Sequence, residues 1–384
     1  MILSFQKDTP HLIILFVNIK ILLFMLLLGH VDIIMFFTYI AENVYIILIG
    51  EKCVSKIHDV AKRANVSIAT VSRVLNPGGH KVNPETADKV REAVKELDYR
   101  PNALARALQM KKTMTIGVII PDISNHYYAE IVRGIQSVAD RAGYNIILQN
   151  TDRDQDRIVK SIYLLREKIV DGIIFSGGTI NGYEPLSALK ELRDRVVVIG
   201  RHDVDFPAIM VDNIAGATLA IEHLIDVGHS RIGLIGWSES STTAKDRLSG
   251  YKNALAQNSC HFDESLVCLG NLTPESGYNH AKILLSQENK PTAIFAGNDQ
   301  MAFGVIYAAI EMGLRVPEDL AVIGFDNIPL SSFFVPPLST IEVPMSTLGS
   351  DSMKTLIRLI SGEQVPRIKL HETRLIVRKS TFNA

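Results

Sequence analysis

Residues 57–76 read IHDVAKRANVSIATVSRVLN, which has the pattern of two short helices joined by a tight turn. Apolar residues recur in the first half at the i, i+3, i+4, i+7 spacing of one helical face: Ile57, Val60, Ala61 and Ala64. Asn-Val-Ser then interrupts the pattern, and Ser67 is placed to cap a second helix from Ile68 to Leu75. This arrangement predicts a helix-turn-helix.

A third helical segment follows after a short loop. Asn83 is placed as its cap, with Pro84 at the first position, and the pattern continues to about Leu97. Residues 54–112 contain twelve Lys and Arg but six Asp and Glu, so the segment carries +6 in a chain of net charge −1. Such a local basic segment is typical of a nucleic-acid-binding module, although a small helical cap with solvated charges has the same pattern.

The predicted second helix supplies the candidate DNA contacts. In a helix-turn-helix this helix enters the major groove, with its N-terminal residues towards the bases. The expected contacts are Ile68, Ala69 and Arg73 at base edges, and Ser67, Thr70, Ser72 and His80 at phosphates.

Longer motifs extend this pattern. Residues 57–76, followed by VNPETADKVREAVKELDYRPNALARALQ, resemble the DNA-binding head of the LacI/GalR family of bacterial transcription regulators. The resemblance continues through TIGVIIPDISNHYYAEIVRGI and GNDQMAFG to VIGFDNIPLSSFFVPPLSTI, and covers roughly residues 55–380. It implies that ALARALQ is a hinge helix that enters the minor groove as a pair, with Leu108 as a wedge between base steps. The other implied contacts in this segment are Asn102, Ala105 and Arg106.

From residue 113 onwards, short β-rich runs alternate with amphipathic segments. The runs are TIGVII, YNIILQ, DGIIFSG, VVVIG, AIMVDN, RIGLIGW, AIFAGND and AVIGFDN, and helices are expected from about Tyr127 and Gln155. The alternation predicts an α/β body of βαβ units with parallel sheets, and the near-continuous apolar runs indicate strands covered on both faces. Neither GxxxxGK[ST] nor GxGxxG follows these strands, so a nucleotide-phosphate site lacks support.

Polar side chains follow several of these runs: Asp122, Arg201, Asn298, Asp299, Asp326 and Asn327. Ligands of parallel α/β sheets bind beyond the carboxyl ends of the strands, and these groups suit a polyol or another polar ligand, although each alone could be a loop cap. The family resemblance assigns effector contacts to Asp326, Arg247 and Asn298, places Leu272 where relatives often have an aromatic residue, and puts Tyr127 near the pocket mouth. Two further candidates rank below these: Arg201 and Asp122.

The resemblance also implies the domain organisation and its use. A helix-turn-helix domain (54–101) and a hinge (102–112) would precede a periplasmic-binding-protein-like body (113–384). The body would have an N-subdomain (about 113–212 and 345–372) and a C-subdomain (about 213–344 and 373–384), with crossings near 211–214, 341–346 and 372–374. Effector bound between the subdomains would change the affinity of a homodimer for a pseudo-palindromic operator. No leucine heptads precede the end of the chain, so a tetramer-forming tail is not expected.

The first 53 residues differ from the rest. Residues 12–29 and 31–49 are apolar runs long enough to suggest a membrane anchor, interrupted by Asn18, Lys20, Asp32 and Glu42. Gly50-Glu51-Lys52 can be encoded by a purine-rich, ribosome-binding-site-like stretch, so the favoured interpretation is upstream DNA translated from an early start, with Val54 as the native start and no membrane partner. A membrane anchor is the alternative. The intact mass of the native protein distinguishes the two.

Composition and missing motifs exclude other classes. With 47% hydrophobic and 21% charged residues in 384, the chain is expected to fold into two or three domains. Three cysteines are too few for a disulfide framework, and Cys260 and Cys268 are expected in a loop-rich stretch. No GxSxG or HExxH motif is present, and six-residue spacing does not place His223 and His229 on one helical face.

The sequence therefore favours a cytoplasmic, ligand-responsive repressor of a sugar-utilisation operon, with operator DNA, a small effector and a second copy as partners. We expect no enzyme activity, cofactor or metal. The alternative is a membrane-tethered sugar-binding receptor, because transport receptors share the body fold. Such a receptor has no use for a helix-turn-helix and hinge.

Overall fold

The computed structural model describes residues 55–75, 82–99, 112–177, 183–192, 195–201, 205–238 and 241–382. The chain divides into two units, Met1–Arg106 and Ala107–Ala384. We call the described part of the first unit the head and that of the second the body. Residues 1–53 lie outside the described residues. Five of the expected DNA contacts also lie outside them: His80, Asn102, Ala105, Arg106 and Leu108.

The head is a small helical unit. Its helices are α3 (Ile57–Arg63), α4 (Ile68–Leu75) and α5 (Pro84–Glu96). Their buried faces form one apolar core: Val60, Ala61, Ala64, Val71, Val90 and Ala93. Ser67 Oγ accepts a hydrogen bond from the Thr70 amide (3.1 Å), and Asn83 Oδ1 accepts one from the Glu85 amide (3.1 Å). Both predicted caps are confirmed, and the turn between α3 and α4 gives the helix-turn-helix.

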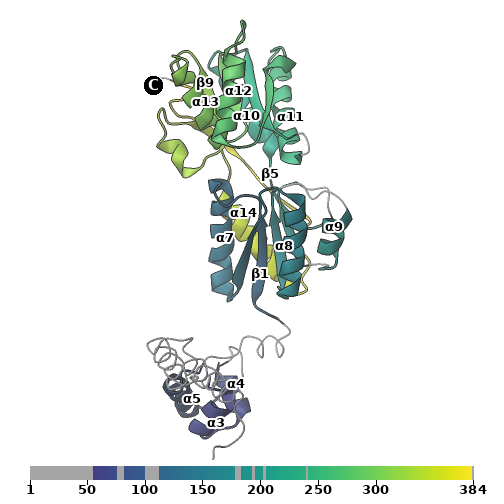
Figure 1. The fold of residues 1–384 in the computed structure, drawn as a ribbon, viewed down its shortest axis with the longest axis vertical. Coiled ribbons are helices and arrows are strands. Elements are labelled where there is room, and N and C mark those ends of the chain that lie inside the picture. The colour runs from purple at the N-terminus through teal and green to yellow at the C-terminus, as the bar shows by residue number, and fades with distance from the viewer. Residues whose placement is uncertain are drawn as a thin grey trace, which may run out of the picture. The chain divides into compact units, whose positions relative to one another are not determined.

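The body contains, within its described residues, two six-stranded sheets. The first sheet has the order β11-β5-β4-β3-β1-β2, and all its strands are parallel. Its strands are β1 (Thr115–Ile120), β2 (Asn145–Asn150), β3 (Gly172–Ser176), β4 (Val196–Ile199), β5 (Ala208–Val211) and β11 (Ile368–His371). The paired helices α7 (His126–Ala142) and α14 (Met345–Ile360) cover one face, and α8 (Gln155–Glu167) and α9 (Tyr183–Lys190) lie on the other (Figure 1).

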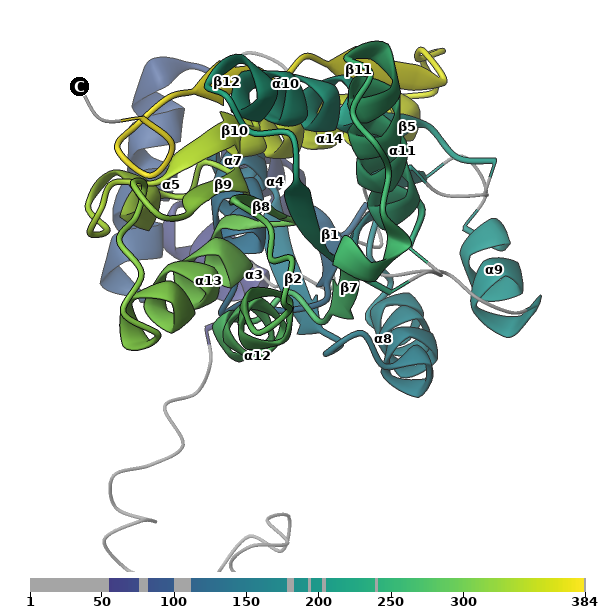
Figure 2. The same ribbon diagram turned by 90° about the horizontal axis from the view of Figure 1, so that it is seen from above.

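The second sheet repeats this plan in the order β12-β10-β9-β8-β6-β7, with β12 antiparallel to β10. Its strands are β6 (Ile232–Trp237), β7 (Val267–Gly270), β8 (Ala293–Ala296), β9 (Ala321–Asp326), β10 (Ser339–Glu342) and β12 (Arg374–Ile376). Helices α10 (Asn213–Asp226) and α11 (Thr242–Gln257) cover one face, and α12 (Pro274–Leu285) and α13 (Asp299–Glu311) cover the other (Figure 2). Two 3-10 turns, Glu264–Leu266 and Pro329–Ser332, complete this half.

The strand pattern explains the layers. Every residue of β3, β4, β8 and β9 is buried, as expected for central strands covered on both faces. The predicted parallel α/β body is therefore confirmed. One detail was wrong: Cys268 lies in strand β7, not in a loop-rich stretch. This strand has four partly exposed residues at a sheet edge, too few to show a strand period.

The chain passes between the sheets three times. β5 of the first sheet leads into α10 on the second, and β10 of the second leads into α14 on the first. Residues 372–373 then join β11 to β12. Neighbouring strands β1 and β2 end level, with Ile120 beside Asn150, and so do β6 and β7, with Trp237 beside Gly270. Side chains that follow different strands therefore meet at one edge.

No helix in the described ranges combines the length and the apolar composition that crossing a membrane requires.

Candidate functional site

The surface of α4 carries the expected base-contacting residues of the head. Ile68 is 45% exposed, and Ala69 and Arg73 are also exposed, while Val71 on the same helix is buried in the core. The hydroxyls of Ser67 and Thr70 lie 2.9 Å apart at the start of the helix. The helix thus presents a guanidinium, two apolar side chains and two hydroxyl groups, a set that suits a DNA groove.

A buried arginine organises the polar site of the body. Arg247 lies on α11 with 6% of its surface exposed. Its Nε donates to Asn213 Oδ1 (3.0 Å), its Nη1 donates to the Gly297 carbonyl, and its Nη2 lies 3.5 Å from Asp326 Oδ1. One side chain therefore joins α10, the end of β8 and the end of β9.

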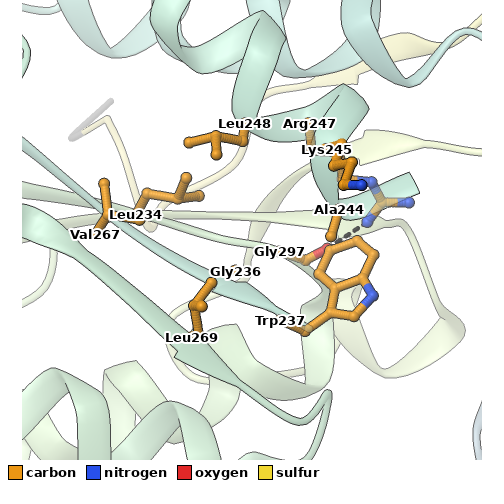
Figure 3. Close-up of a pocket in the computed structure, with 10 residues that line it drawn as sticks. All are labelled: Leu234, Gly236, Trp237, Ala244, Lys245, Arg247, Leu248, Val267, Leu269 and Gly297. Carbon is orange, nitrogen blue, oxygen red and sulfur yellow. Dashed lines mark hydrogen bonds between the residues drawn. The ribbon is translucent and has the colours of Figure 1, made fainter. Parts of the chain in front are cut away.

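Two aromatic rings enclose the same guanidinium. Arg247 Cζ lies 3.4 Å from the centroid of the Phe325 ring and 5.1 Å from that of Trp237. Figure 3 shows Trp237 beside Arg247 and Gly297, with the hydrogen bond between Arg247 and Gly297 as a dashed line. A Cβ atom on Gly297 would lie 2.8 Å from the indole, so the absence of a side chain there makes room for Trp237. The cation is thus held by stacking as well as by polar contacts.

Burial changes the ionisation of the pair. Burial raises the pKa of Asp326 to about 7, the neighbouring Asp299 adds to this, and Arg247 opposes it. Burial also lowers the pKa of Arg247. The backbone of Asp326 has φ 110°, a conformation that costs a non-glycine residue about 1–3 kcal/mol. Strain and a perturbed carboxyl at one strand end are typical of a functional site.

The carboxylate of Asp299 accepts hydrogen bonds from the segment that follows β9 and from β10. Its Oδ2 accepts from the Ile328 amide (2.8 Å) and the Ser331 hydroxyl (2.6 Å), and its Oδ1 accepts from the hydroxyl of Thr340. Burial raises its pKa to about 6. These contacts hold the loop that follows β9, and with it the backbone of Asp326.

Asn298 follows Gly297 in the chain and contacts Leu272. Asn298 Oδ1 caps α13 by accepting from the Met301 amide (2.9 Å), and its Nδ2 donates to the Leu272 carbonyl (3.3 Å). Leu272 has φ 71°, which is strained for a leucine. Both polar atoms of the Asn298 side chain are therefore engaged in the fold.

Tyr127 approaches the site from the first sheet. Asn125 caps α7 by accepting from the Tyr127 amide (3.0 Å), and the Tyr127 and Tyr128 rings meet edge to face with centroids 5.0 Å apart. Burial raises the pKa of Tyr127, and the charge of Asp326 raises it further. Tyr127 is thus brought near the pair formed by Arg247 and Asp326.

The two lower-ranked effector candidates, Arg201 and Asp122, differ in their hydrogen-bond partners. Arg201 Nη2 donates to Asp246 Oδ1 (2.7 Å) and to the Thr242 carbonyl (3.4 Å), which links the end of β4 to α11 one residue from Arg247. Asp122 instead accepts from the amide (2.9 Å) and hydroxyl (2.6 Å) of Ser124, closing its own turn. The structure thus brings Arg201, but not Asp122, towards the cluster around Arg247.

Sequence reasoning missed three residues of this cluster: Trp237, Asn213 and Phe325. Trp237 is the one tryptophan of the chain and ends the predicted strand RIGLIGW, so composition and position could have indicated it. Asn213 follows AIMVD in the same way. Nothing local identifies Phe325, because its contact with Arg247 depends on how α11 packs.

Other titratable residues have structural contacts. His223 Nε2 lies 2.8 Å from the Thr381 hydroxyl, and His229 Nδ1 lies 3.0 Å from that of Thr292. The described residues contain no His, Cys, Asp or Glu cluster that could hold a metal ion.

Comparison with known proteins matches both units. The model for bacterial regulatory proteins of the lacI family matches residues 56–102, and that for the periplasmic binding protein-like domain matches residues 221–381. Catabolite control protein A of Priestia megaterium is 42% identical over 312 residues, covering 80% of this chain and 93% of that protein.

Two further similar proteins are matched over a larger share of both chains. The ribose operon repressor of Halalkalibacterium halodurans is 36% identical over 327 residues, covering 85% of this chain and 96% of that protein. The crystal structure of the lac repressor dimer bound to operator and the anti-inducer ONPF has a TM-score of 0.78 and 30% identity, covering 86% of this chain and 99% of that chain.

Proposed function

Because the chain belongs to the LacI family of bacterial regulatory proteins, we propose that it represses a carbohydrate-utilisation operon under control of a sugar or sugar derivative. Membership of the family makes it a DNA-binding transcription regulator rather than an enzyme. The relatives are named as regulators and lend no support to a membrane-tethered receptor.

The pair formed by Arg247 and Asp326 carries the effector proposal. A guanidinium donates and a carboxylate accepts, so together they suit adjacent hydroxyl groups on one small molecule. Trp237 and Phe325 flank the pair with apolar rings, which suits the faces of a sugar ring. The similarity to a ribose operon repressor supports the same class of ligand.

The head supports direct reading of operator bases. Arg73 is exposed on α4 among the expected base-contacting residues. We infer that two heads of a homodimer read the half-sites of a pseudo-palindromic operator, since the lac repressor binds its operator as a dimer. Effector bound at Arg247 would change operator affinity by shifting the two halves of the body relative to each other.

One measurement tests the whole proposal: binding of the purified protein to the DNA upstream of its own gene, with and without a panel of sugars, at stated salt. Specific binding that one sugar changes is the expected result. Asp326→Asn should keep DNA binding and lose that response. Sugar binding without any specific DNA binding would contradict the proposal.

Base reading has its own test. Arg73→Ala should weaken specific binding by about 1–3 kcal/mol and relax discrimination at one base position. Arg91→Ala, which removes an exposed arginine from α5, is the matched control. An equal loss on every DNA sequence would argue against base reading by Arg73.

A further inference from the structure

A cavity of about 250 Å³ leads away from the polar site, between α11 and the strands β6 and β7. Arg247 and Trp237 line one end of it, and Leu234, Leu248 and Val267 line the other (Figure 3). Its walls therefore change from polar to aliphatic with distance from the guanidinium.

Gly236 keeps the floor of this cavity open. It lies within β6 between buried and half-buried neighbours, where a residue without a side chain weakens the strand. A Cβ atom on Gly236 would lie 3.8 Å from both the Cys268 carbonyl oxygen and Leu269 Cδ2, which are ordinary contacts. Packing within the chain therefore does not require glycine here, in contrast to Gly297. The space above Gly236 belongs to the cavity.

The size and chemistry of the cavity fit an apolar group. An apolar protein cavity of roughly 150 Å³ is known to bind benzene. The cavity beside Gly236 is larger, at about 250 Å³, and shares Arg247 and Trp237 with the polar site. One molecule can therefore place a polar part on the buried ion pair and an apolar part over Gly236.

We propose that the effector is amphiphilic, with an aromatic or branched alkyl substituent that enters this cavity while its hydroxylated part binds Arg247 and Asp326. The proposal rests on the proposed function, because it assigns the effector to that site. It narrows the ligand class from free sugars to sugar derivatives with an apolar substituent.

Benzene tests the cavity without knowledge of the sugar. Trp237 is the one tryptophan in the sequence and lines the cavity, so its fluorescence reports occupancy. We expect a saturable change on titration with benzene, weakened about tenfold or more by Gly236→Val, which fills the floor. Cys268→Val is the control, because Cys268 alternates along β7 with two lining residues, Val267 and Leu269. No saturable change, or one retained in Gly236→Val, would overturn the proposal.

A second variant that fills the cavity tests whether the effect of Gly236→Val comes from misfolding. Ala244→Leu enlarges a lining residue on α11 and leaves the strand unchanged. It should weaken benzene binding as Gly236→Val does, while thermal unfolding shows that the body remains folded.

Paired glycosides test the link to the effector. For each sugar of the panel, calorimetry compares the methyl and the phenyl glycoside. The phenyl member should bind roughly tenfold or more tightly, because its ring leaves water, and Gly236→Val should bring the ratio close to one. A phenyl preference that survives Gly236→Val would overturn the assignment of the ring to this cavity.

Operator binding separates this proposal from the proposed function. Gly236 lies outside the head that reads DNA, so Gly236→Val should still bind operator in the absence of effector. If the unaltered chain bound benzene at the cavity but did not bind operator, the result would contradict the proposed function. It would still support the binding of an apolar group in the cavity.

Discussion

The two sheets of the body have matching strand orders but use the polar groups at their strand ends differently. In the first sheet these groups form exposed hydrogen bonds. Asp122 accepts from Ser124, two residues away, and Asn150 accepts from the Ile123 amide (2.8 Å) across one neighbouring strand. These two bonds are exposed and bury no charge.

In the second sheet the equivalent groups bond across the fold. Arg247 reaches Asn213 and Gly297, which lie 34 and 50 residues away in the chain. Asp299 reaches Ser331 and Thr340, at separations of 32 and 41 residues. The second sheet therefore holds a network of buried charge, and the first sheet adds groups at its border. A repeated architecture thus carries two different chemistries.

The largest expected effect comes from removing the centre of the network. At pH 8, Arg247→Ala should lower the free energy of unfolding by about 3–5 kcal/mol, because it leaves the Asp326 carboxylate buried without its partner. Urea unfolding measures the change. Adding Asp326→Asn to this variant should restore part of the loss, since the unpaired charge is then gone. A loss below about 1 kcal/mol would show that the buried charges of the second sheet contribute no more to stability than an exposed ion pair does.

A smaller effect concerns pH. The folded pKa of Asp326 is raised to about 7, above the ordinary aspartate value, so the folded chain holds a proton that the unfolded chain releases. This contribution is complete below about pH 4 and is lost as the pH rises through 7. The body should therefore unfold at a higher temperature at pH 5.5 than at pH 8. Asp326→Asn should reduce this slope to the smaller part that Asp299 contributes, whereas an unchanged slope would place the titrating group elsewhere.

The smallest effect is expected at the border. Arg201 is 44% exposed in its pair with Asp246, so Arg201→Ala should cost about 0–1 kcal/mol in the same unfolding experiment. It serves as the matched arginine control for Arg247→Ala. A loss as large as that of Arg247→Ala would show that the first sheet shares the buried network.

Local rules account for what the sequence could predict. Ser67 and Asn83 cap their helices through contacts within three residues, and the central strands are continuous apolar runs. Such signals depend on neighbours in the chain. They suffice for the helix-turn-helix and the parallel α/β body.

The arrangement of the site depends on distant contacts. Asp326 is expected from its place after a strand and from the family resemblance, and Arg247 from the resemblance alone. Their enclosure by Trp237 and Phe325 follows from how α11 packs on the sheet. Asp122 also follows a strand, but its carboxylate closes its own turn. Position at a strand end alone therefore does not identify a site residue. Strand β7 was missed because four partly exposed residues show no strand period.

The link between β11 and β12 limits how the two sheets can move. Glu372 and Thr373 alone join these strands, so the Cα atoms of His371 and Arg374 can never be more than roughly 11 Å apart. The sheets therefore cannot draw apart at this edge. It acts as a pivot, and any opening between them must be a rotation whose travel grows with distance from residues 372–373.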